Sequence, residues 1–432
     1  MVSVYPTGTT IYRPDRCWNG FTMLAGATLI DMNGRVRRRW DGFRHGKPMP
    51  GGGVLGEAKV DGRIVVVQMD WDQNTRWQFD GAAGDEDLEP HHDFQREGSP
   101  VGYYAPDQPP KQSGRTLILC RTGVDGRGVV AGQLLDDRII EVDEGGSIVW
   151  EWRSADHIDD IGLDEAARNT LYRASTLPRD YDGLHSPTHG KDPYDWLHSN
   201  SASYVGPNKW YDAGDERFHP ENIIWDSRDT NKIGIISRET GAFAWEIGPD
   251  YARPELRDIG QIIGQHHAHV IPRGLPGEGN ILIFDNGGFA GYGPPNPGAP
   301  IGEYNAVRPY SRVIEFDPIT LERTWEYSAR TAGHGYHHHH LFYSPFMSSA
   351  QRLPNGNTLI CEADSGRAFE VTSEHEIVWE YVVPPDVNER GGISDSYRAY
   401  RLPYEWVPEI RAGAETPVEA PDLSSFHVEP TQ

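Results

Sequence analysis

Residues 312–327, RVIEFDPITLERTWEY, and residues 368–381, AFEVTSEHEIVWEY, share one pattern: a β-branched strand, a tight polar turn, and a second strand that ends near a tryptophan. This pattern is typical of a β-hairpin. It returns at 28–40, 138–152 and 233–247, and a weaker copy lies at 63–81. The six copies end at Trp40, Trp77, Trp150, Trp245, Trp325 and Trp379. A hairpin that recurs six times predicts a repeat architecture.

A further strand of the form GNxLI precedes several of these hairpins, at 114–120, 279–286 and 356–363. We interpret it as the inner strand of each unit, followed by the outer hairpin. Radially arranged antiparallel blades would bury the apolar faces of such units against each other. The sequence therefore predicts an all-β fold, a six-bladed β-propeller, in one domain that spans residues 1–404. The uneven spacing of the tryptophans leaves an irregular β-sandwich as the alternative.

Two segments depart from the repeat. The gap between Trp150 and Trp245 contains DHIDDIGLDEAARNTLYRA, which has helical spacing behind an acidic first turn. We predict a helical insertion between blades at about residues 155–173. Residues 405–432 are rich in Pro and Glu, which predicts a peripheral C-terminal tail.

Charge and composition exclude several classes of partner. The chain of 432 residues has 40 Lys and Arg against 64 Asp and Glu, a net charge of -24, so nucleic acid is not expected as a partner. An anionic substrate would need a locally cationic pocket. The chain has no apolar run of about 18 residues and no apolar signal-like segment near Met1, so we expect a cytoplasmic protein that does not enter membranes. Its three cysteines include no CxxC pair.

Histidines gather where the predicted blades begin. Twelve of the 18 lie in a few clusters: His91, His92, His198, His219, His266, His267, His269, His334 and His337 to His340. Because the innermost strands of a propeller face its channel, one histidine from each of several blades would meet near the axis. Imidazole can bind metals, move protons or act as a nucleophile. The alternative is that these histidines are hydrogen-bonded packing residues at the blade junctions.

Alternation along a strand limits which of these histidines can act together. Four consecutive residues cannot all face one way, so at most two of His337 to His340 share a face. The same alternation separates His266 from His269 unless a bulge intervenes.

Arg228, in WDSRDTN (225–231), is the predicted anion-binding residue, because it lies at a tight turn between two apolar strands. The alternative is a surface ion pair with Asp226 or Asp229, which would contribute little stability. The predicted substrate-binding residues are His92, Asn200, Asn286 and Tyr343. The asparagines are polar neighbours of the candidate histidines, and a tyrosine could stack on an aromatic ligand.

Several stretches resemble the bacterial arylsulfotransferases that use a phenolic sulfate, not a nucleotide, as donor. They include 12–40, WLHSNSASY (196–204), 222–250, GQHHAHVIPRG (264–274), 311–328 and 343–360, and the resemblance covers roughly residues 10–385. It implies a six-bladed propeller and a ping-pong reaction in which a histidine takes the sulfuryl group. Carried over by motif, it implies that His198, His266 and Arg228 are catalytic.

The chain departs from that family at two places. Phe289 and Ala290 follow the FDNG segment, where the family commonly has an arginine, and Cys361 and Glu362 stand where a sulfuryl-accepting histidine is expected. His334 or His337 to His340 are the predicted substitutes.

Two enzymatic functions follow from these residues. The first is sulfuryl transfer from a phenolic sulfate to a phenolic acceptor, with a small aromatic substrate and no required cofactor. The alternative is a metal-dependent lyase, isomerase or hydrolase with a divalent metal at His198, His266 and His339. A propeller that serves only as a binding platform ranks last, because the sequence shows no interaction patch on the rim.

Overall fold

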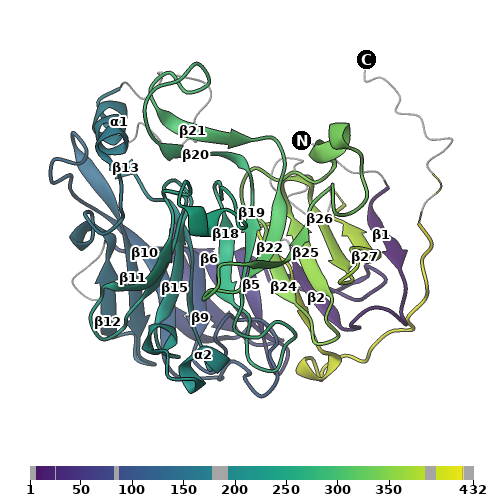
Figure 1. Ribbon diagram of the computed structural model, residues 1–432. Helices are drawn as coiled ribbons and strands as arrows, with labels where there is room; N and C mark the ends of the chain where they lie inside the picture. The colour runs from purple at the N-terminus through teal and green to yellow at the C-terminus, as the bar shows by residue number, and fades with distance from the viewer. Residues whose placement is uncertain are drawn as a thin grey trace, which may run out of the picture.

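The computed structural model describes residues 6–24, 26–81, 87–177, 193–384, 396–420 and 422. Within these residues the chain is an all-β, six-bladed propeller, as predicted (Figure 1). Each blade has four antiparallel strands, and two blades have a fifth strand, which is antiparallel (β1) in one and parallel (β13) in the other. Buried apolar side chains from neighbouring blades pack together in separate clusters, so the apolar core is divided among the blade interfaces.

Four blades are formed by continuous stretches of chain, numbered here in chain order. Blade 2 consists of β5 (Phe43–Met49), β6 (Gly53–Val60), β7 (Arg63–Met69) and β8 (Thr75–Phe79). Blade 3 consists of β9 (Glu89–Arg96), β10 (Thr116–Asp125), β11 (Gln133–Val142) and β12 (Ile148–Arg153), with β13 (Tyr194–Asp195) beside β11. Blade 4 consists of β14 (Ser199–Tyr204), β15 (Ile223–Ser227), β16 (Lys232–Ile236) and β17 (Phe243–Ile247). Blade 5 consists of β18 (His266–Val270), β19 (Ile281–Asp285), β22 (Arg312–Phe316) and β23 (Arg323–Tyr327).

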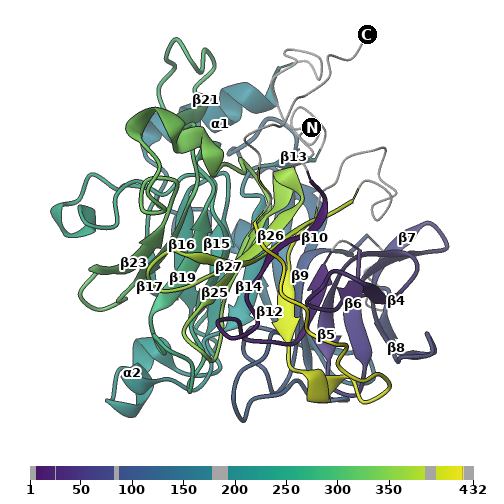
Figure 2. The same cartoon turned by 90° about the vertical axis from the view of Figure 1, so that its right-hand side faces the viewer.

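The two ends of the chain complete the other two blades. In blade 1, β28 (Tyr400–Leu402) supplies the first strand to β2 (Phe21–Leu24), β3 (Thr28–Ile30) and β4 (Val36–Arg39). In blade 6, β1 (Gly8–Tyr12) is the outermost strand after β24 (Ser349–Arg352), β25 (Thr358–Glu362), β26 (Arg367–Val371) and β27 (Ile377–Val382). Figure 2 shows β1 running beside β27. The ring is therefore closed by hydrogen bonds at both ends of the chain.

The repeated tryptophans mark the fourth strand of every blade and join it to the next blade. Five lie on fourth strands, and Trp40 follows β4 by one residue. Each indole N–H donates to a carbonyl in the turn between the third and fourth strands of the following blade. The pairs are Trp40 with Asp70, Trp77 with Glu144, Trp150 with Arg238, Trp245 with Pro318, Trp325 with Ser373 and Trp379 with Met32. The six bonds form a complete ring around the propeller.

The GNxLI segments have a different position from the one predicted. They form β10, β19 and β25, which are the second strands of their blades. The first strands are β9, β18 and β24. The prediction was wrong because these first strands contain fewer apolar residues and carry polar and histidine side chains instead of a hydrophobic repeat.

One end of the propeller carries a helix and an extra hairpin. Helix α1 (Glu165–Ser175) begins behind Asp164, whose side chain accepts from the Ala167 amide. It packs on the hairpin of β20 (Gly288–Tyr292) and β21 (Glu303–Arg308), where Thr170 donates to the Gly293 carbonyl at 2.7 Å. Figure 1 shows α1, β20 and β21 together at the top of the molecule.

The segment between β9 and β10, residues 97–115, crosses the axis at the opposite end. The Pro100 carbonyl accepts from the Tyr204 amide of blade 4, and the Tyr103 hydroxyl lies 2.9 Å from His269 Nε2 of blade 5. The Tyr104 ring packs against Trp406. This segment therefore covers the axis at one end and leaves the end near α1 and β20 for a site.

Among the described residues, no helix combines the length and apolar character needed to span a lipid bilayer. None of the three cysteines forms a disulfide in this part of the chain.

Past residue 404, Trp406 and Val407 are buried, and Val418 bridges to Tyr12, so this part of the predicted tail packs on the propeller.

Candidate active site

Three predicted histidines meet where the first strands of blades 3, 4 and 5 begin. His92 lies on β9, His198 immediately precedes β14, and His266 is the first residue of β18. The rings of His92 and His198 have centroids 5.0 Å apart. The charges of His198 and His266 both act on the pKa of His92. His92 and His198 are partly exposed, and His266 is buried.

The backbone explains this convergence. His92, His198 and His267 have φ values of 60°, 50° and 57°. His92 and His267 each lie where the pairing of a first strand shifts register, which marks a β-bulge, and His198 immediately precedes such a shift, between Ser199 and Ser201. Residues with positive φ that are not glycine carry a conformational cost and cluster at functional sites. In blade 5 the bulge lets His267 and His269 contact each other, with centroids 4.6 Å apart, while His266 joins the other group.

His198 is oriented by Asp195. Its Nδ1 lies 2.7 Å from Asp195 Oδ2, and its backbone amide donates to Asp195 Oδ1 at 3.1 Å. Burial lowers the pKa of His198, but the Asp195 carboxylate outweighs burial, and the net pKa is above its usual value. Nδ1 therefore holds a proton that is donated to Asp195, and Nε2 carries the proton that can be exchanged. This arrangement suits a general acid.

His266 has both ring nitrogens occupied. Nδ1 lies 2.8 Å from Asn286 Oδ1 and 3.1 Å from the Gly264 carbonyl, and Nε2 accepts from the Met347 amide at 3.1 Å. Asn286 donates through Nδ2 to the Ser344 and Met347 carbonyls, so its Oδ1 faces His266. The proton is fixed on Nδ1. Burial, and then the charge of Arg228, holds the pKa of His266 well below its usual value, so the ring is neutral.

Arg228 supplies a buried cation beside His198. It begins the turn between β15 and β16, and its amide donates to the His198 carbonyl at 3.3 Å. Its guanidinium pairs with Asp229 at 2.5 Å and lies over the rings of Phe289 and Tyr304, at 5.6 and 5.7 Å from their centroids. The ion pair with Asp229 that was considered from the sequence is therefore present, but only 4% of Arg228 is exposed, so the pair is buried and the predicted surface location is wrong. Arg228 thus places positive charge against Phe289, the position where the resembled family has an arginine.

The other predicted residues are distributed between this site and the surface. Asn286 holds His266, and Asn200 is buried and donates to the Gln265 carbonyl at 3.0 Å. Tyr343 is partly exposed, and its amide donates to Glu362. His339 lies in a short 3-10 segment (Tyr336–Leu341), where its ring contacts Tyr310 and Tyr336.

In the described ranges, no group of three or more His, Cys, Asp and Glu side chains could hold a metal ion.

The predicted substitutes for a sulfuryl-accepting histidine lie outside the site. His334, His337, His338 and His340 are exposed on the segment that contains Tyr336–Leu341. At the position where that histidine was expected, the Cys361 thiol contacts the Ser396 carbonyl, and Glu362 pairs with Arg367.

Sequence reasoning missed a cluster of buried charges below the histidines. Lys47 Nζ lies 2.7 Å from Asp93 Oδ1, and Arg398 Nη1 lies 3.1 Å from the same oxygen. Arg398 also donates to the Asn200 carbonyl at 2.7 Å, so the cluster joins blades 1 to 4. Burial lowers the pKa of Lys47 to about 8 despite Asp93. Nothing in the local sequence marks these residues, because their partners are far away along the chain.

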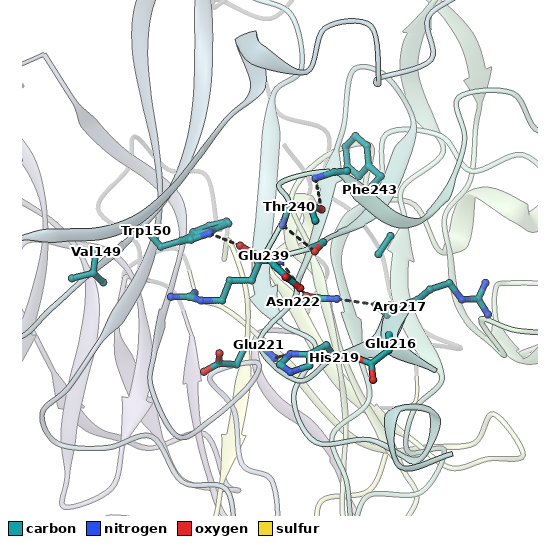
Figure 3. Close-up of a pocket in the computed structure, with 14 residues that line it drawn as sticks. Val149, Trp150, Glu216, Arg217, His219, Glu221, Asn222, Glu239, Thr240 and Phe243 are labelled. Atoms are coloured by element: carbon teal, nitrogen blue, oxygen red, sulfur yellow. Dashed lines mark hydrogen bonds between the residues drawn. The ribbon is translucent and has the colours of Figure 1, made fainter. Parts of the chain in front are cut away.

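A separate hollow of about 710 Å³ lies on the rim, between blades 3 and 4 (Figure 3). Its lining includes Trp150, His219, Glu221 and Glu239, and the Trp150 indole donates to the Arg238 carbonyl there. None of the predicted site residues lines it. It is distinct from the histidine site.

Comparison with known proteins gives one family. The sequence model described as Arylsulfotransferase (ASST) matches residues 107–384. No curated protein matches the chain. Solved structures that match include a protein of unknown function from Bacteroides caccae, with 10% identity, 89% of this chain and 99% of that chain covered, and a TM-score of 0.46. Virginiamycin B lyase from Staphylococcus aureus matches with 10% identity, 87% and 85% covered, and a TM-score of 0.34.

Proposed function

The chain belongs to the arylsulfotransferase family, and on that premise we propose that it transfers a sulfuryl group from a phenolic sulfate ester to a phenolic acceptor. The reaction requires no cofactor, because sulfur keeps its oxidation state and the leaving phenol needs only a proton. The observation that carries the proposal is the buried guanidinium of Arg228 beside the Asp195-supported imidazole of His198. An anion-binding cation and a proton donor are two of the groups that this transfer uses.

Arg228 binds the sulfate group of the donor. An arginine has five N–H donors, and its contacts with Asp229, the Phe289 carbonyl and Tyr304 leave others for a ligand. The aromatic rings of Phe289 and Tyr304 hold the guanidinium plane in place. A buried cation stabilises the charge on the sulfuryl oxygens more strongly than one in water, because the site has a lower effective dielectric constant.

His198 moves the proton. In the first half of the reaction its Nε2–H protonates the departing phenolate, and in the second half the neutral ring takes a proton from the acceptor phenol. Asp195 keeps the ring in the required orientation through both halves. His266 forms the adjacent wall and, through Met347 and Asn286, holds the segment that enters β24.

The test is release of 4-nitrophenol from 4-nitrophenyl sulfate in the presence of a panel of phenols. We expect release that depends on the acceptor, and an increase in KM of at least about 10-fold for Arg228→Met, as expected for loss of a charge-assisted contact. Arg330→Met, at an exposed arginine, is the matched control and should change nothing. Absence of release across all acceptors would contradict the proposal.

A further inference from the structure

The roles above leave a pair of adjacent histidines on β9 without a function. His91 Nδ1 and His92 Nδ1 are 2.7 Å apart, and the two rings are perpendicular. The His91 side chain is 6% exposed, whereas His92 is partly exposed and faces the ring of His198. One nitrogen of this pair must donate and the other must accept, because two lone pairs 2.7 Å apart would repel.

Asp137 decides which nitrogen donates. Asp137 Oδ1 lies 3.3 Å from His91 Nε2, close enough for a charge contact but without the geometry of a hydrogen bond. Asp137 Oδ2 accepts a hydrogen bond from the Ser199 amide at 2.8 Å. A carboxylate can only accept, so the His91 tautomer with a proton on Nε2 is favoured. His91 Nδ1 then accepts from His92 Nδ1–H. His92 Nε2 is therefore left with its lone pair.

We infer that His92 is the nucleophile that accepts the sulfuryl group, at Nε2, and that Asp137 and His91 fix its reactive tautomer. This inference rests on the proposed sulfuryl transfer. It replaces the histidine that the family resemblance led us to expect near Cys361, and it places the nucleophile in blade 3, beside the acid of blade 4.

The other imidazoles of the site do not suit this role. His266 has both nitrogens occupied. Asp195 raises the pKa of His198 above its usual value, so His198 Nε2 carries a proton in place of a lone pair. His92 is neutral at pH 7: burial lowers its pKa well below the usual value, as do the charges of His91, His198, Arg121 and His266. The Tyr397 ring also lies against His92, with centroids 5.8 Å apart.

The transfer balances without any other reactant. The His92 Nε2 lone pair forms the N–S bond, and the S–O bond to the aryl group breaks with its electron pair on the phenolate, which takes the proton from His198. The sulfurylated His92 ring carries a positive charge, and its Nδ1–H still donates a hydrogen bond to His91 Nδ1. The Asp137 carboxylate lies near this charge, on the other side of His91. The acceptor phenol then loses its proton to His198, its oxygen attacks sulfur, and the N–S electron pair returns to Nε2.

The left-handed backbone at residue 92 permits a sharp test. Glycine adopts a φ of 60° without strain, so His92→Gly removes the imidazole and keeps the fold. His375→Gly is the matched control, because His375 has a φ of 69° in the turn between β26 and β27 on the rim. We expect His92→Gly to lose acceptor-dependent release by at least about 100-fold, with partial recovery on addition of free imidazole, as for loss of covalent catalysis. His375→Gly should retain activity.

The positioning role of His91 has its own pair of variants. His91→Asn keeps an oxygen that can accept from His92 Nδ1–H, whereas His91→Leu does not. We expect adduct formation to slow about 10-fold in His91→Leu and to persist in His91→Asn, in line with the loss of a supporting hydrogen bond. Equal slowing in both variants would contradict this role.

The decisive experiment is to incubate the full chain with 4-nitrophenyl sulfate without acceptor, quench in alkali and map the sulfuryl adduct by peptide mass spectrometry. An adduct on His92, absent from His92→Gly, supports the inference. Acceptor-dependent release with the adduct on another residue, or with an unaffected His92→Gly, overturns the inference and leaves the proposed function intact. No release of 4-nitrophenol by the wild-type chain would instead contradict the proposed function.

Discussion

At the scale of single residues, His198 and His266 are neighbours whose hydrogen bonds prepare them for different work. His198 has an acidic partner at one nitrogen, and His266 has neutral partners at both. Their pKa values consequently move in opposite directions from the same starting point. Of these two rings, His198 is the one whose surroundings favour the protonated form.

The role of Asp195 predicts a pH effect. In Asp195→Asn the pKa of His198 should fall, because the charge that raises it is lost. The acid form would then disappear at lower pH, so the alkaline limb of the kcat profile should move to lower pH, with turnover reduced on the order of 100-fold. The profile is measured with 4-nitrophenyl sulfate and a phenol acceptor.

A matched control for this variant exists on the surface. His157 Nδ1 lies 2.9 Å from Asp160 with the same spacing in the chain, and the Asp160 side chain is 56% exposed. Asp160→Asn should leave the profile unchanged. An unshifted alkaline limb in Asp195→Asn would rule out His198 as the acid.

Asp226 predicts an effect of pH on stability. It is fully buried, its Oδ1 has no hydrogen-bond partner, and burial raises its pKa to about 7. Between about pH 4 and 7 the folded chain keeps a proton that the unfolded chain has released, so this group's stabilisation is lost as pH rises through 7. Asp226→Asn should reduce the fall of the free energy of unfolding with rising pH by up to about 1.4 kcal/mol per pH unit. Urea denaturation at several pH values measures it, and parallel curves would contradict it.

At the scale of elements, the hairpin β20–β21 is held to the site by a glycine turn. Gly287 has a φ of 77°, and a Cβ there would lie 2.1 Å from the Tyr310 carbonyl. Gly287→Ala should therefore displace Phe289 from Arg228, reduce the free energy of unfolding by about 1–3 kcal/mol, and raise KM for the sulfate donor. Thermal denaturation and donor kinetics measure the two effects.

Gly333→Ala separates the cost of a left-handed backbone from the cost of the steric clash in Gly287→Ala. Gly333 has a φ of 89°, and a Cβ added there would have no other atom within 4 Å. This variant should show only the cost of the left-handed backbone, with KM unchanged. A Gly287→Ala enzyme with normal KM would show that the hairpin does not position Arg228.

The elements also show how far the sequence could lead. Six hairpins were visible because each has a regular apolar pattern and a tryptophan, and the motif residues His198, His266 and Arg228 do lie in one site. The positive φ values at His92, His198 and His267 could not be predicted, because such a backbone at a histidine leaves no sequence signature. Lys47, Asp93 and Arg398 were missed for another reason: three separate blades bring them together.

At the scale of the whole molecule, the six indole bonds and the two closing strands hold the ring. Strand β28 escaped the sequence analysis because it stands alone, far from the hairpin whose sheet it completes. It follows residues Tyr397 and Arg398, which approach Asn200 across the axis. Closure of the ring and assembly of the site thus depend on the same C-terminal stretch.

The six indole hydrogen bonds around the propeller predict losses of stability that depend on how deeply each bond is buried. Trp245→Phe removes the buried bond to the Pro318 carbonyl at 2.9 Å and should lower the free energy of unfolding by about 1–3 kcal/mol, because the carbonyl is left unsatisfied. Trp77→Phe should cost less, since its bond to Glu144 is exposed to water. Denaturant unfolding of both variants measures this, and equal losses would show that the bond is not the cause.

The central claim is that the axial site transfers a sulfuryl group through a covalent enzyme intermediate. It is tested most directly by rapid mixing of the chain with excess 4-nitrophenyl sulfate in the absence of any acceptor. The account predicts a burst of about one 4-nitrophenol per chain, then a stall that ends when a phenol is added. Steady release without an acceptor, or no burst before the acceptor arrives, would contradict it.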